Sequence, residues 1–161
     1  MKRVLAVLAI AGFSAAWAQT SPASPPAPLA GLPRSEVQIE TAGGRHMFQV
    51  WVADNDTSRE QGLMFIKELA QNQGMLFLFE RPGLAAFWMK NTYVSLDIVF
   101  IAPGGVVANI AHDTQPLSLA PIESIAPVSG VLELVAGTAA RIGLVPGDRV
   151  RNPALTALTT P

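Results

Sequence analysis

The chain has 161 residues, of which 50% are hydrophobic and 14% are charged, with a formal net charge of −1. This length accommodates one ordinary domain with flanking segments, and the apolar content excludes a disordered, highly charged chain because it suffices to offset the entropy lost on folding. The balanced charge, without a basic run, argues against a nucleic-acid partner, and the absence of cysteine excludes thiol nucleophiles, disulfides and zinc–thiolate sites.

The N-terminus has the pattern of a secretory signal peptide over residues 1–18. Lys2 and Arg3 precede an apolar stretch over 4–16, and Ala-Trp-Ala follows at 16–18, the form that signal peptidase cleaves. The apolar stretch is too short for a bilayer, which needs about 20 residues. Residues 19–33 are rich in proline and are predicted to form an extended linker. We therefore expect an exported protein, periplasmic or secreted, without a transmembrane segment after cleavage.

The remainder is predicted to form a single β domain over 34–153 and a short tail over 154–161. Residues 36–40 and 45–52 alternate polar and apolar around a Thr-Ala-Gly-Gly turn, which places Glu40 opposite Arg45. Further strands are predicted over 74–79, 86–91, 96–101, 106–110, 131–135 and 149–151, with a long loop over 112–129 that holds one short strand at most.

Helical signals are few in this domain. Thr57 and Glu60 have the spacing of a capping box for a helix that ends at Gly62, and one further helical turn ends at Gly143. The chain does not alternate strands with long helices. The pattern therefore predicts a mainly β, antiparallel, jelly-roll-like sandwich or barrel with one or two short helices.

The residues with chemical potential gather in the segment 87–100. If 92–95 connect a hairpin, Lys90 faces Asp97 on the next strand, and Trp88 lies on the same face. An unpaired charge in such apolar surroundings would cost several kcal/mol, so this pairing is required if the face is covered. Trp88 could add a cation–π contact with Lys90. The opposite face is predicted to be core and carries Phe87, Met89, Ile98 and Phe100.

Three interpretations of this cluster stay open. Lys90 and Asp97 form a structural ion pair beneath a loop; or Trp88 stacks on a sugar ring or other flat group to which Lys90 and Asp97 hydrogen-bond; or one of the two is the general base of a hydrolase or transferase. Asn91 and Glu133, the latter on the solvent or pocket face of its strand, complete the candidate binding residues. We predict a binding or structural module rather than an enzyme, with a small-molecule or glycan ligand, no cofactor, no catalytic residue and unspecified protein partners.

Two weaker metal signals complete the analysis. Asp54-Asn55-Asp56 is similar to the start of a calcium loop but lacks the glycine and the distal glutamate, so a turn and helix cap are predicted. A periplasmic copper(I) site is a second alternative, although methionines usually fill gaps in a core. Its candidate ligands lack a metal-binding spacing and are Met47, Met64, Met75, Met89, His46 and His112, together with Trp88.

Several short strings occur in order along the domain: Gly62-Leu63-Met64, Gly74-Met75-Leu76-Phe77, Phe87-Trp88-Met89-Lys90-Asn91-Thr92, Leu96-Asp97-Ile98, Val131-Leu132-Glu133-Leu134 with Gly137, and Gly147-Asp148. In these strings the chain resembles the family called domain of unknown function 192, over about 37–151. The resemblance implies a mainly β, jelly-roll-like sandwich and no established activity, cofactor or catalytic residue. Many members have an arginine in place of Ile66; if that arginine contacts a ligand, Lys67 substitutes for it here or the contact is lost.

Overall fold

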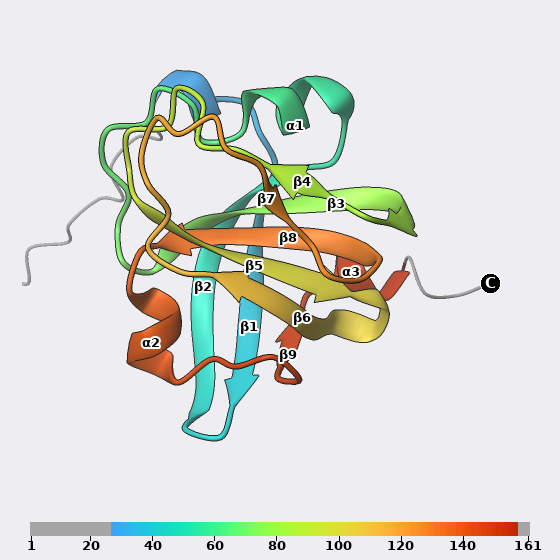
Figure 1. The fold of residues 1–161 in the computed structure, drawn as a ribbon. Coiled ribbons are helices and arrows are strands. Elements are labelled where there is room, and N and C mark those ends of the chain that lie inside the picture. The colour runs from blue at the N-terminus through green and yellow to red at the C-terminus, as the bar shows by residue number, and fades with distance from the viewer. Residues whose placement is uncertain (1–26, 158–161) are drawn as a thin grey trace, which may run out of the picture.

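The computed structural model describes residues 27–157 (Figure 1). The predicted signal peptide and residues 19–26 of the predicted linker lie outside the described residues, as do 158–161. None of the helices within 27–157 is long and apolar enough to cross a membrane. In chain order the elements are η1 (Ala27–Leu29), β1 (Arg34–Thr41), β2 (Gly44–Ala53), α1 (Asp56–Gln61), β3 (Gln73–Gly83), β4 (Ala86–Phe87), β5 (Leu96–Ala102), η2 (Pro103–Gly105), β6 (Val106–Ala111), β7 (Ile122–Glu123), β8 (Val128–Val135), α2 (Thr138–Ile142), β9 (Arg149–Arg151) and α3 (Pro153–Ala157).

The main sheet is a closed barrel with the strand order β1-β2-β3-β8-β5-β6-β9. This confirms the prediction of a mainly β fold and its barrel form. The antiparallel prediction is wrong for one pair, because β2 and β3 run parallel. Parallel neighbours need a crossover connection, and the segment 54–72, which contains α1, provides it.

Local signals in the sequence located most of the turns correctly. Glu40 and Arg45 are register partners in the β1–β2 hairpin and form an ion pair of 3.8 Å, as predicted. Glu40 also accepts a 2.8 Å hydrogen bond from Arg151 of β9, which lowers the pKa of Glu40. α2 ends at Gly143 in the left-handed conformation, again as predicted. The contact between Glu40 and Arg151 joins β1 to β9, the first and last strands of the barrel.

The capping residues of α1 differ from the prediction. Asn55, not Thr57, caps the helix: its side chain accepts a hydrogen bond from the Ser58 N–H, and the Ser58 hydroxyl accepts one from the Asn55 N–H. Asn55 has extended backbone angles, so the first helical turn begins at Asp56 and the predicted Thr57–Glu60 box lies inside the helix. The interpretation of 54–56 as a turn and cap is confirmed, and the helix ends at Gly62 as expected.

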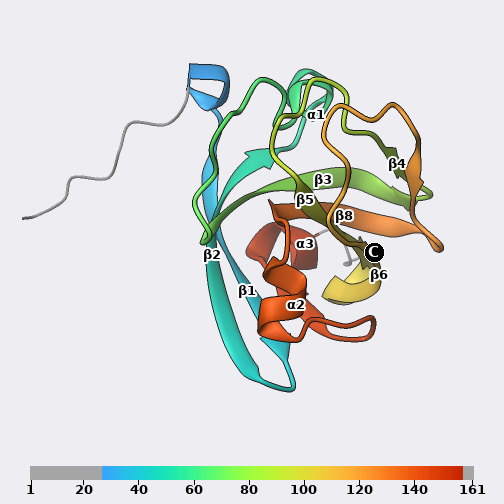
Figure 2. The same cartoon turned by 60° about the vertical axis from the view of Figure 1, so that its left-hand side comes forward.

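The core has two apolar layers on the two faces of the same strands. The barrel interior holds Val99 and Ile101 of β5, with Leu132 and Leu134 of β8. A second layer lies outside the barrel, where the loops over 62–72, 84–95 and 112–127 cover β3, β8 and β5 (Figure 2). This outer layer contains Met89, Ile98 and Phe100, with Phe87 packed against it, so the predicted core face is confirmed. Leu29, near the end of the predicted linker, is also buried in this layer, and Leu155 of α3 is buried in the barrel interior.

Candidate functional site

The predicted hairpin between 86–91 and 96–101 does not form. Only Ala86 and Phe87 are in a strand, β4, which pairs with β7, whereas β5 pairs with β6 and β8. The chain turns at Asn91, whose φ is +54°, and the Thr92 N–H closes this turn on the Met89 carbonyl. Both edges of β5 are therefore occupied, and the expected pairing of Lys90 with Asp97 is wrong.

Asp97 has a different set of partners. Its side chain is fully buried, and its two oxygens accept hydrogen bonds from the backbone N–H groups of Ala139, at 2.7 Å, and Asp113, at 3.0 Å. His112 Nδ1 lies 4.0 Å from Oδ1. A carboxylate beside the first turn of α2 is favourable because free N–H groups gather there. Asp97 therefore joins β5 to α2 and to the loop after β6.

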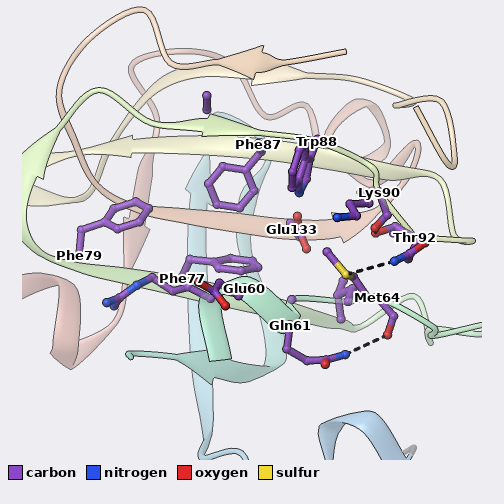
Figure 3. A pocket seen from close by; sticks show the side chains of 15 residues that line it. Glu60, Gln61, Met64, Phe77, Phe79, Phe87, Trp88, Lys90, Thr92 and Glu133 are labelled. Atoms are coloured by element: carbon purple, nitrogen blue, oxygen red, sulfur yellow. Dashed lines mark hydrogen bonds between the residues drawn. The ribbon is translucent and has the colours of Figure 1, made fainter. Parts of the chain in front are cut away.

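The other four candidate residues come together around one cavity, which we call the Trp88 pocket. It has a volume of about 620 Å³ and is formed by 59–64 of α1 and the loop after it, by 86–88 and 90–92, and by Phe77, Phe79 and Glu133 (Figure 3). Trp88, Lys90, Asn91 and Glu133 thus line the same cavity, whereas Asp97 does not. The cavity is open to solvent rather than sealed beneath the loop 112–129, because Trp88 is 51% exposed.

Aromatic rings form one wall of the Trp88 pocket. Phe87 packs edge-on against Phe77, with 4.9 Å between ring centroids, and edge-on against Phe100 of the outer layer at 6.1 Å. The Lys90 ammonium lies over the Trp88 ring, 5.0 Å from its centroid, as predicted for a cation–π contact. Phe87 is thereby anchored in the core, whereas much of the Trp88 indole remains exposed.

Glu133 is the buried polar group of the Trp88 pocket. It lies on β8 between Met75 of β3 and Ile98 of β5, is 5% exposed, and its Oε2 has no hydrogen-bond partner in the described part of the chain. Burial raises the pKa of Glu133 to about 8, because the low-dielectric surroundings disfavour the charged form. Its carboxyl group points into the cavity, next to Trp88 and Lys90 (Figure 3). A single acidic residue inside the apolar run 131–135 was the signal in the sequence.

Backbone hydrogen bonds hold the walls of the cavity in place. The Phe65 N–H donates to the Asn91 carbonyl at 2.8 Å, and the Asn91 side chain contacts the sulfur of Met64 at 3.8 Å. Phe65 and Asn91 both have positive φ, a backbone state that is uncommon outside glycine. On the far side, the Met89 N–H donates to the Ser118 carbonyl at 3.0 Å. These bonds preorganise the pocket.

Ile66 and Lys67 do not line the Trp88 pocket. Ile66 is buried in the outer layer, and Lys67 is exposed on the surface. Lys67 therefore supplies no cation to the Trp88 pocket.

The candidate copper ligands are distributed over different parts of the fold. Met64 lines the Trp88 pocket, whereas Met75 and Met89 are buried in the outer layer and Met47 is half exposed on β2. His46 contacts Thr41 in the β1–β2 hairpin, and His112 approaches Asp97. Among residues 27–157, no three His, Cys, Asp or Glu side chains are placed to hold a metal.

Comparison with known proteins supports the resemblance seen in the sequence. The profile of the domain of unknown function 192, described as "Uncharacterized ACR", matches residues 37–152. The chain belongs to the domain of unknown function 192 family. The crystal structure of a protein from Sinorhizobium meliloti 1021, described as a proposed transcription regulator, is 43% identical with a TM-score of 0.73, over 74% of this chain and 94% of that protein. A protein of unknown function from Novosphingobium aromaticivorans DSM 12444 is 37% identical with a TM-score of 0.76, over 88% of this chain and 100% of that protein. No curated protein matches the chain.

Proposed function

We propose that this protein binds a small ring-containing molecule non-covalently in the Trp88 pocket, without catalysing a reaction. The observation that carries the proposal is a 51% exposed indole at the opening of a cavity of about 620 Å³ with aromatic walls. Pockets for small ligands usually measure about 300–1,000 Å³ and combine apolar walls with a few polar groups. Here Lys90, Asn91 and Glu133 are among the polar groups, which also include Arg59, Glu60, Gln61 and Thr92.

The contacts around the pocket favour this function over a structural ion pair and over catalysis by Asp97. A structural ion pair is not formed, because no described carboxylate pairs with Lys90 and both oxygens of Asp97 accept backbone N–H groups. For the same reason Asp97 is poorly placed to act as a general base: it neither lines the cavity nor has a free oxygen directed into it. The fold does not use Lys90 and Glu133 for pairing, which leaves them available to a ligand.

We also propose that the chain is exported and acts in the periplasm or outside the cell. The proposal rests on the basic, apolar and Ala-Trp-Ala pattern over residues 1–18. N-terminal sequencing of protein from the periplasmic or secreted fraction is expected to begin at Gln19. An N-terminus at Met1, with the protein retained in the cytoplasm, would contradict it.

Replacing Trp88 with alanine is expected to weaken ligand binding by about tenfold or more, because aromatic contacts contribute about 0.5–1.5 kcal/mol beyond the area they bury. Benzyl alcohol and methyl glucoside serve as probes for an aromatic and a sugar ring, at millimolar concentrations. Binding is measured from amide NMR shifts. We expect saturable shifts at pocket residues such as Met64, Phe77 and Glu133.

The matched control is Tyr93→Ala. Tyr93 is an exposed aromatic in the same loop, 48% exposed, but it does not line the cavity. Tyr93→Ala should bind the probes like the wild type, and both variants should keep the wild-type melting temperature within a few degrees. The proposal is wrong if Trp88→Ala binds the ligand as tightly as Tyr93→Ala, or if neither these neutral probes nor a charged ring-containing probe shifts the pocket amides.

A further inference from the structure

The charged groups at the Trp88 pocket differ in how far they are already neutralised. Arg59 donates to the Leu78 carbonyl at 2.8 Å and pairs with Asp56 at 2.7 Å. Glu60 on α1 and Lys90 are both exposed, so solvent and salt screen their charges in the absence of a ligand. Lys90 forms no ion pair with any carboxylate in 27–157, and its ammonium lies over the Trp88 ring. Lys90 is therefore the cation of the pocket that is available to an incoming anion.

Glu133 supplies a second polar group at the same place. Glu133 is only 5% exposed, and its Oε2 has no hydrogen-bond partner among the described residues. Its carboxyl group points into the cavity near Lys90 (Figure 3). Its neighbours from β3 and β5, Met75 and Ile98, carry no charge, and the titratable groups around the cavity are Arg59, Glu60 and Lys90. Burial raises the pKa of Glu133 to about 8, so at neutral pH the carboxyl group carries an O–H that can donate a hydrogen bond.

We propose that the ligand of the Trp88 pocket is an aromatic carboxylate, whose ring lies against Trp88 and whose carboxylate is held between the ammonium of Lys90 and the carboxyl group of Glu133. This inference rests on the proposed function, because it specifies the ligand class of the same cavity. A carboxylate only accepts hydrogen bonds, and both protein groups donate at neutral pH. One ligand group thus satisfies the free cation and the buried carboxyl together.

Other ligand classes fit the cavity less well. A ligand ammonium would need ionised Glu133 and would lie next to the Lys90 ammonium, a like charge. A neutral ring would gain no charge interaction with the Lys90 ammonium, which is exposed and stays hydrated without a ligand. A sugar would place hydroxyl groups against Phe77, Phe79 and Phe87, which offer no hydrogen-bond partners, and burying unpaired hydroxyls is unfavourable. An aromatic ring matches these walls.

Three probes with the same ring separate the classes: sodium benzoate, benzamide and benzylamine, titrated into the full chain and followed by amide NMR shifts. We expect benzoate to bind at least about tenfold more tightly than benzamide, and benzylamine not to saturate. Lys90→Met should weaken benzoate binding about tenfold and leave benzamide binding unchanged. Lys67→Met is the matched control, because Lys67 is exposed and outside the cavity, and it should bind like the wild type.

The pH dependence of benzoate binding tests the role of Glu133. As the pH rises from 6.5 to 9, Glu133 ionises beside the ligand carboxylate, so the affinity for benzoate should fall about tenfold or more. Glu133→Gln keeps an N–H donor and cannot ionise, so its affinity should stay constant over this range. If the affinity of the wild type for benzoate does not change with pH, the proposed contact between Glu133 and the ligand carboxylate is wrong.

The outcomes distinguish the two levels of the proposal. If benzamide or benzylamine binds as tightly as benzoate and depends on Trp88, the carboxylate inference is wrong and the proposed function stands. If benzoate, benzamide, benzylamine, benzyl alcohol and methyl glucoside all leave the pocket amides unshifted, the proposed function itself is wrong.

Discussion

Glu133→Gln is expected to raise the free energy of unfolding at pH 7 by about 3 kcal/mol and to remove much of its pH dependence between about pH 5 and 8. An unfolded glutamate has a pKa near 4.5, and burial raises the pKa of Glu133 to about 8 in the folded protein. Between these values the folded state holds a proton that the unfolded state has released. Stability is therefore greatest below the unfolded pKa and falls by up to about 1.4 kcal/mol per pH unit until the pH passes the folded pKa. Glutamine has no such transition.

The measurement is urea unfolding of wild type and variant at pH 5, 6, 7 and 8. Glu60→Gln is the matched control, because Glu60 lines the same cavity but is exposed, and it should keep the slope of the wild type. If the free energy of unfolding changed with pH in the same way for wild type and Glu133→Gln, Glu133 would be ionised in the folded protein. It could then not donate a hydrogen bond to a ligand carboxylate.

Asp97→Asn should lower the free energy of unfolding by about 2–3 kcal/mol, because it leaves a buried backbone N–H without an acceptor. Both Asp97 oxygens accept backbone N–H groups, and the amide of asparagine would turn one acceptor into a donor that faces a donor. Urea unfolding at pH 7 checks this. Asp148→Asn is the control: Asp148 accepts the Val145 N–H at 3.0 Å in an exposed turn, where a substitution usually changes the free energy of unfolding by about 0.5 kcal/mol or less.

Ligand binding separates this structural role from the binding role that the sequence suggested for Asp97. At a temperature where Asp97→Asn remains folded, its affinity for benzoate should equal that of the wild type, because Asp97 does not line the Trp88 pocket. If Asp97→Asn had wild-type stability but no longer bound benzoate, Asp97 would instead be a ligand-binding residue.

The sequence pointed to residues that the structure brings together, but not to the geometry that brings them together. Trp88, Lys90, Asn91 and Glu133 stood out because they are polar or aromatic residues within apolar strings, and the structure places all four at one cavity. The hairpin that was expected to bring them together with Asp97 does not form, because β5 pairs with β6 and β8 instead. Met64, Phe77 and Phe87 also line the cavity, and this position had no separate signal in the sequence.

The sequence by itself determined the features that depend on neighbouring residues. Alternation and the glycine turn produce the β1–β2 hairpin with Glu40 opposite Arg45, Gly62 and Gly143 end their helices, and the family strings identify the domain. Only the tertiary structure decided which strands flank β5 and what Lys90 and Asp97 contact. The physical reason is that alternation specifies the face of a strand and not its partner, and β5 is apolar on both faces because a core layer covers each. With no polar face to distinguish β6, β8 or 86–91 as neighbours, the pairing followed from the closure of the whole barrel.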